Sequence, residues 1–129
     1  MGVKLSQRLR VKAAVIPQDI QAARTSPYAS IAGSGQIMAA VTTAALLVGK
    51  KATVQFLQAQ DAAGTGSKNL GSAVDKVATV AGPVDFVAEA YTEGLDDGFS
   101  FVAVRLSSDN GAAVLGSAML IAANNRFNP

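Results

Sequence analysis

Short runs in which apolar and polar side chains alternate, separated by turn residues, constrain the fold of this chain most. The clearest run spans residues 51–60, where Val54 and Phe56 alternate with polar residues. A period of two with β-branched and aromatic residues is typical of a half-buried strand. The run leads to Gly64 and Gly66, which supply the positive φ angles of a loop. The pattern predicts a strand at 51–60 followed by a surface loop at 61–72.

Five further segments have the composition of short strands, namely 36–48, 74–80, 84–91, 99–106 and 112–122. The Ala content of the first also suits a helix, but its β-branched residues and lack of capping signals favour a strand. The turn at Gly49 predicts a hairpin over 36–60, and Asn110-Gly111 predicts a type I′ hairpin between the last two segments. Six short strands predict an all-β fold, an antiparallel β-sandwich or small barrel.

The first 35 residues differ from the rest in charge. Residues 1–24 have five cations against the single carboxylate of Asp19, a net charge of +4, whereas residues 25–129 have six basic and eight acidic side chains. Pro17 and Pro27 interrupt regular structure, and 29–35 is rich in Ser and Gly. We therefore predict two parts, a basic N-terminal arm and linker at 1–35 and a β-sandwich domain at 36–129.

The basic arm has several candidate roles. Its alternation over 8–15 suits an edge strand added to another sheet, and the spacing of Leu5 and Leu9 also suits a short basic helix. A solvated tail, or binding to nucleic acid phosphates, are further alternatives, although no aromatic residue precedes Tyr28 to stack on bases. We expect the arm to fold on an acidic neighbouring subunit and predict no nucleic acid partner. The candidate subunit-contact residues are its cations Lys4, Arg8, Arg10, Lys12 and Arg24.

The composition also argues against catalysis. The chain has no Cys and no His, so it lacks the commonest metal ligand, the commonest general base and any thiolate site. Residues 64–68 look like a phosphate loop, but Ser precedes Lys where the motif needs the reverse order. Glu93, Asp96 and Asp97 offer oxygen ligands for Ca²⁺ without the spacing of an EF-hand, which favours a solvated turn. We predict no enzyme activity, no cofactor and no metal.

Hydropathy and aromatic content predict where the chain is made and what its core is like. The longest apolar-rich run, 38–48, is too short to span a bilayer, and the basic N-terminus leads into no apolar signal region. We therefore expect synthesis in a cytoplasm and no membrane partner. Half of the residues are hydrophobic but only 5% are aromatic, which predicts a thin core of small side chains and a subunit stabilised by its neighbours.

Three phrases occur in order along the chain, at residues 57–70, 93–102 and 120–129. Through these three phrases, residues 36–129 resemble a family of small tailed-phage virion proteins, the head decoration or minor capsid proteins. The sequence departs from the family pattern at Phe127, where the family has Tyr, and at Asn124-Asn125, where it has Gly-Asp.

The resemblance implies a structural role in the virion head. The expected function is decoration or cementing of the capsid through subunit contacts, with the major capsid protein and copies of the chain, as a dimer or trimer, for partners. A phage tail or head-tail connector protein is an alternative reading. A β-sandwich carbohydrate-binding module is another, although such a module needs exposed aromatic side chains and the chain has no Trp.

Overall fold

The computed structural model describes residues 9–32 and 34–124, which form strands and one short 3₁₀ helix. The strands are β1 (Leu9–Asp19), β2 (Arg24–Thr25), β3 (Ala29–Ser30), β4 (Ser34–Thr43), β5 (Lys51–Ala59), β6 (Lys68–Val77), β7 (Asp85–Tyr91), β8 (Phe101–Ser108) and β9 (Leu115–Asn124). The 3₁₀ helix η1 (Thr92–Gly94) directly follows β7.

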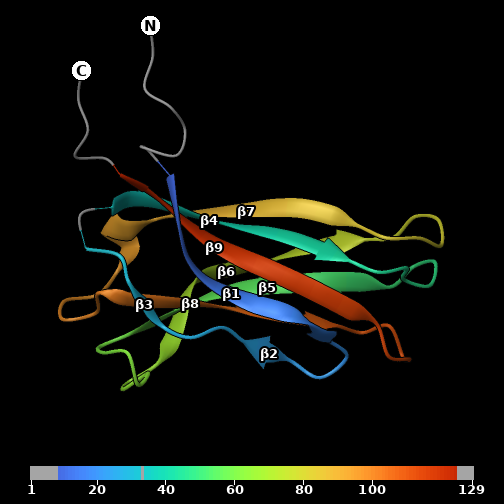
Figure 1. Ribbon diagram of the computed structural model, residues 1–129, viewed down its shortest axis with the longest axis horizontal. Helices are drawn as coiled ribbons and strands as arrows, with labels where there is room; N and C mark the ends of the chain where they lie inside the picture. Colours follow the sequence, from blue (N-terminus) through green and yellow to red (C-terminus); the bar gives the residue numbers. More distant parts are fainter. Residues whose placement is uncertain (1–8, 33, 125–129) are drawn as a thin grey trace, which may run out of the picture.

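These strands form the two antiparallel sheets seen in Figure 1. Sheet A has the order β1-β9-β4-β7, and sheet B has the order β2-β8-β5-β6. The short strand β3 also pairs with β8. Arg24 of β2 lies opposite Leu106, and Ala29 of β3 lies opposite Val102. The two short strands are therefore parts of one interrupted strand at the edge of sheet B.

The chain moves from one sheet to the other at almost every connection. If β2 and β3 are counted together, only β5 and β6 are consecutive strands of the same sheet. Two four-stranded sheets connected in this way form a jelly roll, an architecture built from Greek keys. The predicted all-β antiparallel sandwich is confirmed.

Both predicted hairpins are wrong. The first fails because β4 belongs to sheet A and β5 to sheet B, and the second fails because β8 and β9 are likewise in different sheets. The chain does bend at Asn110-Gly111, with Gly111 at φ 80°, but the predicted type I′ turn is wrong because Asn110 does not have a positive φ. The buried Asn110 side chain anchors this bend, since its Oδ1 accepts a hydrogen bond from Leu47 N at 2.8 Å. Turn residues determine where the chain reverses, but they do not select the sheet that receives the next strand.

The glycine-rich segment instead forms a hairpin between β5 and β6, with Gln58 opposite Lys68. The predicted loop at 61–72 is therefore too long, because β6 begins at Lys68. Asp61 organises the turn: its Oδ1 accepts from Ala63 N at 3.0 Å and Thr65 N at 3.1 Å.

Residues 9–32 are part of the sandwich, which differs from the predicted boundary at residue 36. β1 is an edge strand of the chain's own sheet A. Val15, Ile20 and Ile31 are at most 2% exposed and belong to the same core as the later strands. This region adds three strands, so the described residues contain nine rather than six. Residues 1–8 of the predicted arm lie outside the described residues.

The core lies between the two sheets and is formed by the side chains that point inward from both of them. Sheet A contributes residues such as Ile37 and Leu120, and sheet B contributes Val54, Val104 and Leu106, all at most 1% exposed. Small residues let the layers approach closely. A Cβ at Gly116 of β9, for example, would lie 2.6 Å from Cδ1 of the buried Ile20.

Candidate functional site

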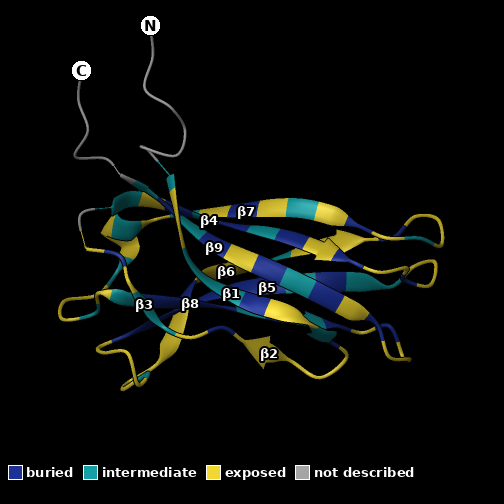
Figure 2. Cartoon of the chain, in the orientation of Figure 1, coloured by how far each residue is buried: buried dark blue, intermediate teal, exposed yellow. Residues whose placement is uncertain are grey.

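The side of sheet A that points away from the core, here called outer face A, is mostly apolar. Strand register aligns its side chains in rows across the sheet. In one row Ala40 of β4 lies between Met119 and Val87. Of the ten large hydrophobic residues exposed among the described residues, six lie on this face: Val11, Ile16, Val87, Tyr91, Leu115 and Met119. Figure 2 shows exposed residues alternating with buried or half-buried ones along β9 and β7.

Two shallow hollows lie on outer face A. One, of about 170 Å³, lies over β1, β9, β4 and β7 and has Met38, Ile121 and Glu89 in its wall. The other, of about 480 Å³, lies over β9, β4 and β7 and includes Met119 and Val87. Large contiguous apolar patches are uncommon on monomeric proteins and mark interaction surfaces. Outer face A is therefore the candidate functional site.

Negative charge on outer face A is concentrated on the edge strand β7. Asp85 and Glu89 are both exposed there and point the same way, because they are four residues apart in a strand. Asp85 Oδ1 accepts a hydrogen bond from Thr42 Oγ1 at 2.6 Å. Within the described part of the chain neither carboxylate forms an ion pair. This acidic margin is available to a basic partner.

The corresponding side of sheet B, outer face B, has a polar part on β5 and β6 whose groups bind one another or the backbone. Thr53 Oγ1 donates to Asp75 Oδ1 at 2.7 Å, and Lys51 Nζ lies 3.4 Å from Asp75 Oδ2. The hydrogen bond from Thr53, with a smaller effect of Lys51, lowers the pKa of Asp75. Gln55 is only 6% exposed and donates to the carbonyl oxygens of Phe56, at 2.8 Å, and Gly71, at 3.2 Å. Polar groups that are already satisfied offer little to a ligand.

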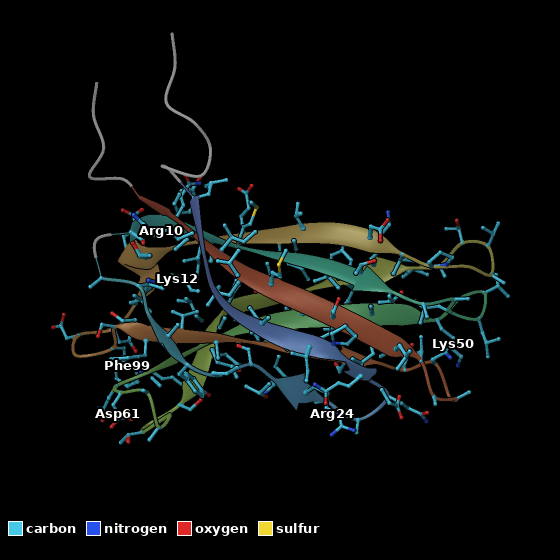
Figure 3. The ribbon with its side chains drawn as sticks, viewed as in Figure 1. Arg10, Lys12, Arg24, Lys50, Asp61 and Phe99 are labelled. Carbon is cyan, nitrogen blue, oxygen red and sulfur yellow. The ribbon has the colours of Figure 1, made fainter. Side chains whose placement is uncertain are left out.

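The five cations predicted as subunit contacts are not brought together as one patch in the described structure. Arg10 and Lys12 lie on β1, whereas Arg24 lies on β2 of the other sheet, apart from them in Figure 3. Arg24 Nε donates to the carbonyl oxygen of Asp19 at 2.9 Å. Lys4 and Arg8 lie outside the described residues.

Sequence reasoning missed outer face A, although a signal for it exists. Segment 112–122 is apolar at nearly every position, so both faces of β9 are apolar. Such a run is typical of a strand covered on both sides. In this chain one of the two sides is exposed, with Leu115 at 57% and Met119 at 44%.

The other motifs of the sequence have structural roles. Hydrogen bonds from the Thr65 hydroxyl and backbone lower the pKa of Asp61 and hold its loop. Gly64 packs against the Tyr28 ring. Asp96 forms an ion pair with Lys68, whose ammonium lies 4.5 Å from the centroid of the Phe99 ring. Figure 3 places Asp61 and Phe99 at the same end of the molecule.

Over the described ranges, 9–32 and 34–124, no three Asp or Glu residues gather in a way that could hold a metal ion. In the same ranges no helix has the length and hydropathy of a membrane span.

No family model matches the sequence, and no curated protein matches it. Similarity is found among solved structures. The PBSX exported protein XepA superposes with a TM-score of 0.59 at 10% identity, over 100% of this chain and 41% of that protein. The protein of the T13 infectious bursal disease virus particle gives a TM-score of 0.52 at 8% identity, over 95% of this chain and 32% of that one. This chain thus spans less than half of either protein.

A carbohydrate-binding module of class CBM28, specific for non-crystalline cellulose, also superposes. Its TM-score is 0.53 at 6% identity, over 83% of this chain and 69% of the module. At such low identities the similarity concerns the fold alone. The chain therefore has a jelly-roll sandwich of the kind found in viral particle proteins and in carbohydrate-binding modules.

Proposed function

We propose that this chain is a structural component of a phage particle that attaches to the head through outer face A. The observation that carries the proposal is the contiguous apolar surface on a sandwich whose core is already complete. Leu120 points into that core, fully buried, while its neighbour Met119 is 44% exposed on the outer face. Burying such side chains against a partner stabilises the complex by about 25 cal/mol per Å² of apolar area.

The resemblance of residues 57–70, 93–102 and 120–129 to tailed-phage head proteins supports the same proposal. The fold likeness to the infectious bursal disease virus particle agrees with it. The proposed partners are the major capsid protein and other copies of the chain, and the proposed action is decoration or cementing without catalysis. In a symmetric lattice, many weak contacts of this kind add up to stable attachment.

The test compares one charge substitution on each sheet. Met119→Lys alters outer face A, and Val77→Lys alters a residue of nearly the same exposure, 46% against 44%, on β6 of sheet B. The purified variants are mixed with empty heads assembled without this protein, and bound protein is quantified after sedimentation. We expect saturable binding of the unmodified chain and of Val77→Lys. Met119→Lys should bind about 100-fold more weakly, because an unpaired charge buried at an interface costs several kcal/mol.

Equal binding by the two variants would remove outer face A from the proposal. Binding to purified tails or connectors instead of heads would support the alternative of a tail or head-tail connector protein. Saturable binding to cellulose or to a glycan, without binding to any phage part, would support the carbohydrate-binding alternative.

A further inference from the structure

The edge strand β7 has one side with no partner strand among the described residues. It is the last strand of sheet A and pairs only with β4. The pairing runs from Gln36 opposite Tyr91 to Thr42 opposite Asp85 without a register shift. β7 contains no Pro and no Lys. An edge that is regular and seven residues long presents a row of free backbone N–H and C=O groups to an added strand.

The other edges of the two sheets are blocked. β1 contains Pro17 and two register shifts against β9. β6 is interrupted by a register shift and by Gly71 at φ 72°. β2 and β3 are two residues long and separated by Pro27. Bulges, prolines and short strands are the usual means by which proteins prevent edge pairing. β7 is therefore the edge on which strand addition is structurally open.

Charge spacing identifies a fitting strand. Asp85 and Glu89 lie four residues apart on the outward side of β7, and Lys4 and Arg8 are also four residues apart in the sequence. In an antiparallel pairing that places Lys4 opposite Glu89, Arg8 falls opposite Asp85. Opposite charges directly across a strand pair are favourable. The same register places Leu5 beside Ala88, which faces the core.

The arm of the same molecule cannot form this pairing. β1 lies at the other edge of sheet A, so Leu9 is four strand spacings, about 19 Å, from a strand added beyond β7. Arg8 is joined to Leu9 by one peptide unit, about 3.8 Å long. The arm that pairs with β7 must therefore come from another copy.

We propose that residues 3–8 of one copy add as an antiparallel strand to the free edge of β7 in a second copy, with Lys4 opposite Glu89 and Arg8 opposite Asp85. This inference deepens the proposed function, on which it rests, by naming a second copy as partner and an edge as contact. Each subunit both gives an arm and receives one, so the contact either closes as a reciprocal dimer or links copies into a ring or a lattice.

A disulfide experiment tests the register. The chain has no Cys, so introduced thiols are the only ones present. Ser6 and Val87 lie opposite each other in the proposed pairing, and strand neighbours are close enough for a disulfide. A Ser6→Cys variant is mixed with a Val87→Cys variant under mild oxidation, both free and bound to heads. We expect a mixed dimer on denaturing gels, and none when Val77→Cys on β6 replaces Val87→Cys.

Absence of the mixed dimer in both settings would overturn the proposal. A dimer formed by Val87→Cys alone would also overturn it, since that product indicates pairing of β7 with β7 of another copy.

Charge reversal provides an independent test by sedimentation velocity. Lys4→Glu with Arg8→Glu, or Asp85→Lys with Glu89→Lys, should each weaken self-association about tenfold. A mixture of the two double variants should associate like the unmodified chain, because the acidic arm of one variant meets the basic β7 edge of the other. Variants that only damaged the fold would not recover association on mixing. If the mixture does not regain self-association while head binding is intact, the strand-addition proposal is wrong and the proposed function is unaffected. Loss of head binding by the unmodified chain removes the proposed function itself.

Discussion

The outer faces of the two sheets are built on the same core yet have opposite surfaces. Outer face A exposes apolar side chains such as Ile16, at 68%, and Met119. On outer face B, by contrast, Thr53, Asp75 and Gln55 engage one another or the backbone. Both sheets present one face to the core, so folding does not require the difference. We infer that the polar face stabilises the free subunit, whereas the apolar face is reserved for a partner.

The largest expected effect separates the two sides of a single strand. Leu120→Ala should lower the free energy of unfolding by about 2–5 kcal/mol, because it leaves a cavity in the core. Met119→Ala, one residue earlier on outer face A, should change it by less than about 0.5 kcal/mol. Urea unfolding of the free subunit measures both. If Met119→Ala were as destabilising as Leu120→Ala, outer face A would be part of the fold and not a reserved surface.

A matched pair of glutamine substitutions compares the two outer faces directly. Gln55→Leu should cost about 1–3 kcal/mol of stability, since the carbonyl oxygens of Phe56 and Gly71 lose a buried donor. Gln36→Leu, at an exposed position of outer face A, should cost less than about 0.5 kcal/mol. Both are measured by thermal and urea unfolding. Equal effects would show that outer face B is no more important to folding than outer face A.

The smallest expected effect is the loss of folding stability at acidic pH. Hydrogen bonds lower the pKa of Asp75 on outer face B and also the pKa values of Asp19 and Asp61. A carboxyl whose pKa is lower in the folded state adds stability above its ordinary pKa of about 4. That stability is lost as the pH falls through the folded-state pKa. The melting temperature should therefore fall below about pH 4.

Asp75→Asn should lose less stability over this acid range than the unmodified chain, because it has one shifted carboxyl fewer. Calorimetry between neutral and acidic pH measures the difference. Identical acid profiles for the two proteins would mean that the Thr53–Asp75 contact contributes nothing to folding.

The periodicity of the sequence was sufficient for the fold class and for several strands. Segments 51–60 and 84–91 correspond to β5 (Lys51–Ala59) and β7 (Asp85–Tyr91) within one residue at each end. Alternation is a local property, set by where successive side chains point along an extended backbone. The absence of thiolate and imidazole groups likewise follows from composition, because the chain has no Cys and no His.

Strand partners were beyond the reach of the same reasoning. The positions at which the chain reverses, Gly49 and Asn110-Gly111, were located correctly, but the strands that flank each of them join different sheets. The alternating run in residues 8–15 suited an edge strand added to another sheet or a short helix, whereas the structure pairs β1 with β9 of the chain's own sheet A. Which strand becomes a neighbour depends on how both layers pack around a shared core, and no short window contains that information.

Residue order alone thus dictated short strands, an antiparallel sandwich and a basic beginning, because these follow from local periodicity and composition. Only the folded arrangement decided that β1, β4, β7 and β9, distant along the chain, form one sheet with an apolar outer face and an open edge. The physical reason is that pairing and layer packing are long-range: they bring Met119 beside Ala40 and Val87 in one row, although each of them reads as an ordinary strand residue in its own segment.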